Sequence, residues 1–173
     1  MLLTILQRFF WMVVLVAAQL LVFNHIHLLG YITPLVMGYM VVRMHRGTSR
    51  IAILVWGFVT GLLFDIFSNT AGMAAASCTL IAMIQPVLLE MQVPRDSAEN
   101  LIPSFSTLGF WNYAFFVFLL MAALHSCFYL LDAFTLADLT LTLTSILGGS
   151  VLSTFIIICI ELLTQTKKEK THH

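Results

Sequence analysis

Charged side chains are scarce in this chain of 173 residues. Asp, Glu, Lys and Arg together make up 9% of the sequence, whereas a typical soluble domain carries about 25%. So few charges cannot cover a water-exposed surface, which excludes an ordinary soluble domain. The eight Lys and Arg balance the eight Asp and Glu, and this lack of a net charge removes a broad basic surface for nucleic acid.

Cysteine pairs and catalytic motifs are missing as well. The three cysteines, Cys78, Cys127 and Cys159, each lie in an apolar run and form no CxxC pair, so neither a disulfide framework nor a zinc site is expected. The sequence contains no glycine-rich phosphate loop. The apolar runs show no nucleophile with its base and no paired aspartates of the kind that intramembrane proteolysis needs. We therefore predict a protein that is not an enzyme and has neither a cofactor nor a metal site.

Apolar sequence is what the chain has in abundance. Hydrophobic residues make up 60% of it, and its mean hydropathy is +0.99. Crossing a hydrocarbon core of about 30 Å takes a helix of about 20 residues, and polar breaks divide the chain into six apolar runs. Because runs such as 115–124 are apolar on every face, the alternating strands of a barrel do not fit. We predict an all-α integral membrane protein, a six-transmembrane-helix bundle with spans at about 9–27, 28–42, 51–67, 71–90, 109–131 and 140–163.

The first two runs fit this scheme least well. They are short unless they extend into residues 3–7 and 25–29, and Pro34 lies where it would kink or break a helix. A full hairpin and a shallower, partly re-entrant pair are both open, and we favour the hairpin because bare polar backbone is not tolerated in lipid. All spans belong to a single membrane domain, residues 1–166. A cytoplasmic tail, 167–173, follows, and its last three residues are either native or the start of a purification tag.

The basic residues indicate how the bundle is oriented. With six spans, all eight Lys and Arg fall on the side that carries both termini and the loops at 43–50 and 91–108. The opposite side carries His25, His27 and Asp132 and has no Lys or Arg. The positive-inside rule places the basic side in the cytoplasm, so both termini are predicted to be cytoplasmic.

A pattern of small and acidic residues marks the third span. Gly57, Gly61 and Asp65 are each four residues apart, so they line one face of a helix, and Gly72 follows after a short turn. Two glycines on one face let a neighbouring backbone approach closely. An ionisable group near the end of a span needs protein, water or the interface around it. Asp65 therefore has three possible roles. It caps or hydrogen-bonds the following turn or a neighbouring helix, it contacts a ligand or a partner, or it takes part in proton coupling.

The sixth span repeats the small-residue face with Ser145, Gly149 and Ser153. Such faces pack helices closely together. His125 in the fifth span has no second His, Asp or Glu in its run, so we interpret it as a packing histidine rather than a metal ligand or a proton relay. Gln19 is interpreted as an interhelical hydrogen-bond donor.

The stretch Gly61-Leu-Leu-Phe-Asp65-Ile-Phe-Ser-Asn-Thr-Ala-Gly72-Met-Ala-Ala resembles the signature of the MreD family of bacterial rod shape-determining proteins. That family shows Gly-x-x-x-Asp on its third span, then a turn, a glycine and small residues. The length, the six spans and the near-absence of extramembrane domains are also similar, over nearly the whole chain. The six-helix architecture is similar, too, to that of the S components of energy-coupling-factor vitamin transporters.

The resemblance implies a scaffold of the bacterial inner (cytoplasmic) membrane that takes part in cell-wall elongation and helps to maintain rod shape. MreD proteins pair with MreC, a single-span protein with a periplasmic domain, and work with MreB, RodA and a penicillin-binding protein. Membrane lipids would surround such a chain, and nucleic acid is no partner. The residues expected to serve partner binding or helix packing are Gly57, Gly61, Asp65, Gly72, Ser145, Gly149 and Ser153. The alternative is a small-molecule-binding S component with a pocket open to the outside near Asp65, His25 and Asp132.

Overall fold

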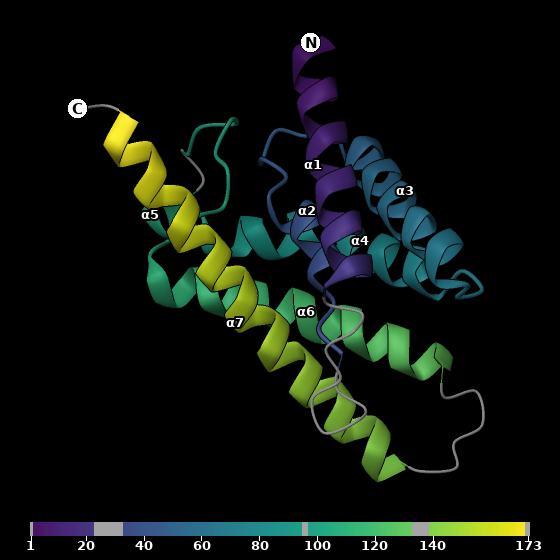
Figure 1. The fold of residues 1–173 in the computed structure, drawn as a ribbon. Helices are drawn as coiled ribbons and strands as arrows, with labels where there is room; N and C mark the ends of the chain where they lie inside the picture. The colour runs from purple at the N-terminus through teal and green to yellow at the C-terminus, as the bar shows by residue number, and fades with distance from the viewer. Residues whose placement is uncertain (1, 23–32, 95–96, 133–138, 172–173) are drawn as a thin grey trace.

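Every element that the structure describes is a helix. The computed structural model describes residues 2–22, 33–94, 97–132 and 139–171. Four helices are long and apolar enough to cross a membrane, namely α3, α4, α6 and the Thr140–Thr164 part of α7. In chain order the elements are α1 (Leu2–Leu21), the 3-10 helix η2 (Val36–Gly38), α2 (Tyr39–Val42), α3 (Arg50–Ser68), α4 (Met73–Gln92), α5 (Phe105–Leu108), α6 (Phe110–Asp132) and α7 (Leu139–Thr171) (Figure 1).

The long helices pack in the order of the chain. α3 packs against α4, α4 against α6 and α6 against α7, whereas α1 contacts α3, η2 and α2. Large side chains fill the space between them, and Phe64, Tyr113 and Phe116 are at most 2% exposed. The start of α1 and the end of α7 lie toward the same end of the molecule, the top of Figure 1.

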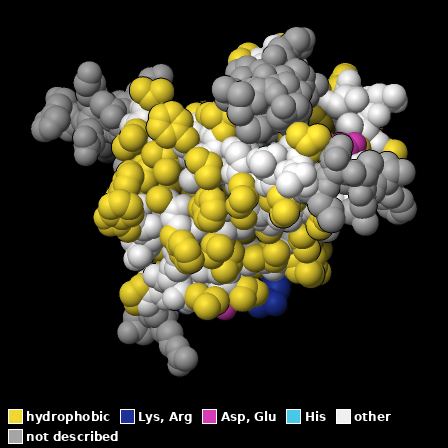
Figure 2. Space-filling view, turned by 90° about the horizontal axis from the view of Figure 1, so that it is seen from below, with side chains coloured by type: hydrophobic (Ala, Val, Ile, Leu, Met, Phe, Trp, Pro, Cys, Tyr) yellow, Lys and Arg dark blue, Asp and Glu magenta, His cyan; other side chains and the backbone are white. Residues whose placement is uncertain are grey.

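The outer surface of the bundle is largely apolar. Phe10, Phe115 and Phe155 are all more than half exposed. Figure 2 shows apolar side chains spread over the face seen from below, with few charged side chains among them. Water would solvate such a surface poorly, whereas lipid tails solvate it well, so the surface is that of a membrane protein.

The helices compare closely with four of the predicted spans. α1 begins earlier than its predicted span 9–27 and ends at Leu21, and α7 continues beyond its predicted end. The limits predicted as 51–67 and 71–90 are Arg50–Ser68 and Met73–Gln92 in the structure. α1 begins at Leu2 rather than near residue 9, because residues 2–6 are mostly apolar and extend the run. α7 continues to Thr171, so most of the predicted tail is helical.

The second predicted span, 28–42, is not a continuous helix in its described part. Residues 33–35 are not helical, and η2 and α2 then form only a short helical stretch. Pro34 explains the break, because proline lacks an N–H and disfavours a helical conformation of the residue before it. The straight second helix of the predicted hairpin is therefore not observed over residues 33–42, and residues 23–32, which would connect it to the first run, lie outside the described part.

The segment after this break returns along α1. Near the end of α1, Gln19 donates a hydrogen bond to the Pro34 carbonyl, and near its start Arg8 contacts His45. The two contacts pair an early residue of α1 with a late residue of the segment, so the two run antiparallel. Over this distance α1 rises by about 16 Å.

Candidate functional site

Gly57 and Gly61 of α3 form the contact between α3 and α4. At Gly57 an added Cβ would lie 2.8 Å from both the Cys78 carbonyl oxygen and Ala82 Cβ. Gly61 is tighter, because a Cβ there would overlap the carbonyl group of Ala74. These two small residues therefore act within the chain, where they let the backbones of two helices touch.

Asp65 caps the start of α4. The N-cap residue, Gly72, makes no side-chain hydrogen bond, so the free N–H groups of the first turn need another acceptor. Asp65 Oδ1 accepts from the N–H of Ala74 at 3.0 Å, and Oδ2 accepts from the N–H of Ala75 at 2.8 Å. Oδ1 also accepts from the Thr70 hydroxyl at 2.5 Å. Through these hydrogen bonds one side chain joins α3, the turn and α4. Its negative charge is also favoured at a helix N-terminus.

Gly72 serves the backbone conformation of the turn rather than its packing. Its φ is +84°, in the left-handed region that favours glycine, and an added Cβ would meet nothing within 4 Å. Asn69, Ala71 and Gly72 are exposed. The tip of the α3–α4 hairpin, residues 69–72, is therefore a surface feature whose shape Asp65 holds.

The small-residue face of α7 also acts within the chain. Ser145, Gly149 and Ser153 are all buried. At Gly149 an added Cβ would lie 2.5 Å from Cδ2 of His125, so the glycine makes room for the imidazole. His125 Nδ1 is 2.8 Å from the Met121 carbonyl oxygen, and its Nε2 is 3.4 Å from Ser153 Oγ. The imidazole is thus enclosed between α6 and α7.

Gln19 replaces hydrogen bonds that the broken segment cannot make itself. Its Nε2 donates to the Pro34 carbonyl at 2.7 Å, and its Oε1 accepts from the N–H groups of Val36 and Met37 at 2.6 Å and 3.3 Å. The amide is fully buried. Backbone that is not helical persists at membrane depth only where protein satisfies its polar groups, and Gln19 does so for three of them.

Ser153 holds the same segment from the other side. Its Oγ accepts from the Leu35 N–H at 2.9 Å. α1 and α7 therefore meet through the segment that lies between them, and Ser153 of α7 has a second role beyond helix packing.

Gln19→Leu should lower the free energy of unfolding by several kcal/mol, because two buried N–H groups and one carbonyl would each lose a partner at a cost of about 1–3 kcal/mol. The midpoint of thermal unfolding in detergent measures this loss. The matched control is Gln92→Leu, since Gln92 Oε1 is buried without a hydrogen-bond partner among the described residues and its removal should cost little. Equal midpoints for the two variants would contradict the role assigned to Gln19.

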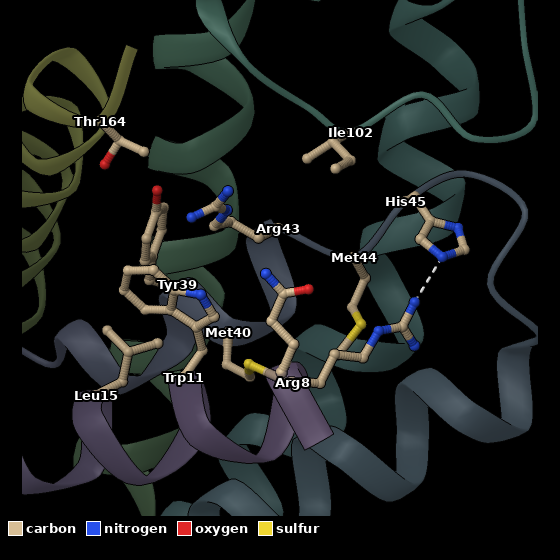
Figure 3. Close-up of a pocket in the computed structure, with 11 residues that line it drawn as sticks. Arg8, Trp11, Leu15, Tyr39, Met40, Arg43, Met44, His45, Ile102 and Thr164 are labelled. Carbon is tan, nitrogen blue, oxygen red and sulfur yellow. Dashed lines mark hydrogen bonds between the residues drawn. The ribbon is translucent and has the colours of Figure 1, made fainter. Parts of the chain in front are cut away.

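A cavity of about 380 Å³ lies where α1, the segment 39–45 and α7 come together (Figure 3). Among the described residues, its walls carry two arginines, several apolar side chains and no acidic side chain. The residues that line it are Gln7, Arg8, Trp11, Leu15, Tyr39, Met40, Arg43, Met44, His45, Ile102 and Thr164.

The two arginines of this cavity are held in different ways. Arg8 Nη2 donates to His45 Nε2 at 2.5 Å, and the Arg43 guanidinium lies 5.6 Å from the ring centroid of Trp11 and 5.7 Å from that of Tyr39. Burial lowers the pKa of His45, and the positive charge of Arg8 lowers it further. The imidazole is therefore neutral at pH 7 and accepts the hydrogen bond from Arg8. A neutral imidazole does not balance the positive charge of either arginine.

Comparison with known proteins does not assign a family. No protein-family model, curated protein or solved structure matches this chain. Functional inference therefore rests on the residues of the chain and their geometry.

Sequence reasoning found the residues of the two small-residue faces and missed the basic cavity. The structure brings the face of Gly57, Gly61 and Asp65 against α4, and that of α7 against α6. The available signal for the cavity was Arg8 followed by Trp11 one turn later, opposite a second arginine beyond the next run. His25 and His27 lie outside the described residues, and Asp132 is exposed at the end of α6.

Proposed function

We propose that this chain is a non-enzymatic scaffold of a bacterial inner membrane, of the MreD type, that binds MreC and helps to maintain rod shape. MreB, RodA and a penicillin-binding protein would be further members of the same assembly. The observation that carries the proposal is how the signature from Gly61 to Gly72 is used. Its first glycine makes the helix contact, its carboxylate caps α4 and its last glycine shapes the turn. A motif used entirely to hold a hairpin suits a scaffold better than a reactive site.

Six crossings and cytoplasmic termini are part of this proposal. The return of the segment 33–45 along α1 supports a second crossing beside those of α1, α3, α4, α6 and α7. Near Arg46 the loop after α2 meets the loop before α5: the Arg46 N–H donates to the Leu101 carbonyl at 3.0 Å, and the Gly47 N–H donates to that of Glu99 at 2.6 Å. The positive-inside rule makes this arginine-bearing end cytoplasmic, so the tip 69–72 faces the periplasm.

An S component has less support. It needs a pocket open to the outside near Asp65, but both carboxylate oxygens of Asp65 accept hydrogen bonds from α4. The cavity lined by Arg8 and Arg43 lies at the opposite end of α3 from Asp65.

Co-purification tests the scaffold. The tagged chain is co-expressed with MreC of the same bacterium and isolated in mild detergent, and we expect MreC to elute with it at a constant ratio. Ala71→Lys places a charge on the exposed tip without entering the core. It should lower the MreC recovered per chain by about fivefold or more, the effect of one important interface residue. Quantitative immunoblotting measures the ratio.

The matched control is Ser106→Lys, which adds the same charge at an exposed position of α5, at the other end of the bundle. It should retain MreC at the unmodified ratio. If MreC does not elute with the unmodified chain although both proteins are inserted in the membrane, the proposed function is wrong.

A further inference from the structure

The cavity between α1, the segment 39–45 and α7 combines positive charge with apolar walls. Arg8 and Arg43 supply the charge, and Leu15, Met40 and Ile102 supply apolar surface. Its volume of about 380 Å³ falls within the range of about 300–1,000 Å³ typical of small-molecule sites. Such walls suit a ligand that has an anionic part and an apolar part.

Along α1 the lining changes character in one direction. Arg8, Trp11 and Leu15 are three and four residues apart, so they share one face of the helix over about 10 Å. The order of a guanidinium, an amphipathic ring and an aliphatic side chain is the order in which a lipid presents its phosphate, its glycerol region and its acyl chains. Trp11 is 39% exposed, so it borders both the cavity and the surroundings of α1. Tryptophan is favoured at that level of a membrane.

Both arginines line the cavity, and contacts within the chain fix the position of each guanidinium group. The guanidinium group of Arg43 lies near the rings of Trp11 and Tyr39. The guanidinium group of Arg8 donates a hydrogen bond to neutral His45, on the other side of Met44 (Figure 3). The carboxylate of Glu161 accepts a hydrogen bond from the Tyr39 hydroxyl at 2.5 Å and does not line the cavity. A guanidinium has several N–H donors in one plane and binds a phosphate with two of them.

We propose that this cavity binds an anionic glycerophospholipid, with the phosphate at the end of the cavity that Arg8 and Arg43 line and an acyl chain along Trp11 and Leu15. A headgroup without a positive charge is favoured, because none of the described residues that line the cavity has a carboxylate to pair with an ammonium group. Phosphatidylglycerol has this chemistry, and phosphatidylcholine does not. Basic pockets between membrane helices bind headgroups of this kind. The site does not depend on the binding of MreC.

Fluorescence quenching of Trp11 tests the lipid site. The chain has three tryptophans, and the double variant Trp56→Phe and Trp111→Phe leaves Trp11 as the single reporter. The protein is reconstituted in phosphatidylcholine vesicles that contain a minor fraction of brominated phosphatidylglycerol. A second preparation contains the same fraction of brominated phosphatidylcholine instead. We expect brominated phosphatidylglycerol to quench Trp11 more strongly than its share of the lipid predicts. Each arginine that contacts the phosphate should contribute a factor of about five to the preference for phosphatidylglycerol over phosphatidylcholine.

Variants of the cavity separate a built site from general attraction to a positive surface. Arg8→Gln and Arg43→Gln should each lower the preference by about fivefold. Ile102→Glu, which adds a carboxylate to the wall and keeps both arginines, should lower it as well. The matched control is Arg50→Gln, because Arg50 is exposed and does not line the cavity, and it should keep the preference.

Two results would overturn the proposal. An equal loss of preference with Arg50→Gln and Arg43→Gln would mean that only the overall charge of this end attracts the lipid. Equal quenching by the two brominated lipids would mean that the cavity does not select an anionic lipid, and a change in Trp11 fluorescence on adding soluble glycerol phosphate in that case would mean that the site takes a free phosphate. Unchanged thermal midpoints of the variants ensure that the comparison reports on binding.

Discussion

Gly61→Leu should lower the midpoint of thermal unfolding of the detergent-solubilised protein by at least about 5 °C. The side chain would enter a contact in which even a Cβ overlaps the Ala74 carbonyl and lies 2.6 Å from the Ala75 Cα. Because those atoms belong to the backbone of α4, no side-chain rotation can relieve the overlap. The two helices have to separate, and the loss of their contact is expected to exceed the usual cost of overpacking, about 1–3 kcal/mol.

Two further substitutions make this experiment specific. Gly61→Ala should already destabilise the protein, because the first added carbon meets the backbone. Ala76→Leu is the matched control: it adds a leucine of the same size to the exposed face of α4 and should leave the midpoint nearly unchanged. A normal midpoint for Gly61→Leu would show that α3 and α4 are not in close contact.

Asp65→Ala should lower the free energy of unfolding by about 2–6 kcal/mol, because the N–H groups of Ala74 and Ala75 each lose an acceptor that costs about 1–3 kcal/mol to remove. Asp65→Asn should also be defective, at about half that loss. An amide has one acceptor oxygen, and its NH₂ would face one of the two N–H groups. Chemical or thermal unfolding of the purified proteins measures their stability, which should decrease from the unmodified protein to Asp65→Asn and then to Asp65→Ala.

Asp132→Asn is the matched control for the loss of a carboxylate, since Asp132 is exposed at the end of α6. It should unfold like the unmodified protein. If Asp65→Asn were as stable as the unmodified protein, the two-oxygen cap would be wrong, and one oxygen would suffice.

Local features of the sequence predict most of the long helices. The ends of α3, α4 and α6 lie within two residues of the predicted spans, because an apolar run of suitable length is a property of the run itself. The anchoring of the turn by Asp65 could also be predicted, because it too is local: Thr70 is only five residues away. What the spacing did not indicate is that both carboxylate oxygens would be taken by α4.

Contacts between distant segments account for what the sequence did not predict. Pro34 marks a break, but the side chains that make the break tolerable are Gln19, 15 residues before it, and Ser153, on the last helix. Local sequence does not show that Gln19 and Ser153 contact this segment, so from sequence alone a hairpin of two full spans was the reasonable expectation. The cavity depends in the same way on the pairing of Arg8 with His45, which are 37 residues apart.

The bond from Leu35 to Ser153 also bears on the order of events during synthesis. The two residues are 118 positions apart. At about 5–20 residues per second, a ribosome needs about 6–24 s to reach the serine after the leucine has been added. Throughout that interval the nascent chain holds a backbone N–H whose final acceptor has not yet been made. The segment around Leu35 therefore acquires this partner only after α7 has been made, so the finished contact between α1 and α7 cannot form while the first helices are being synthesised.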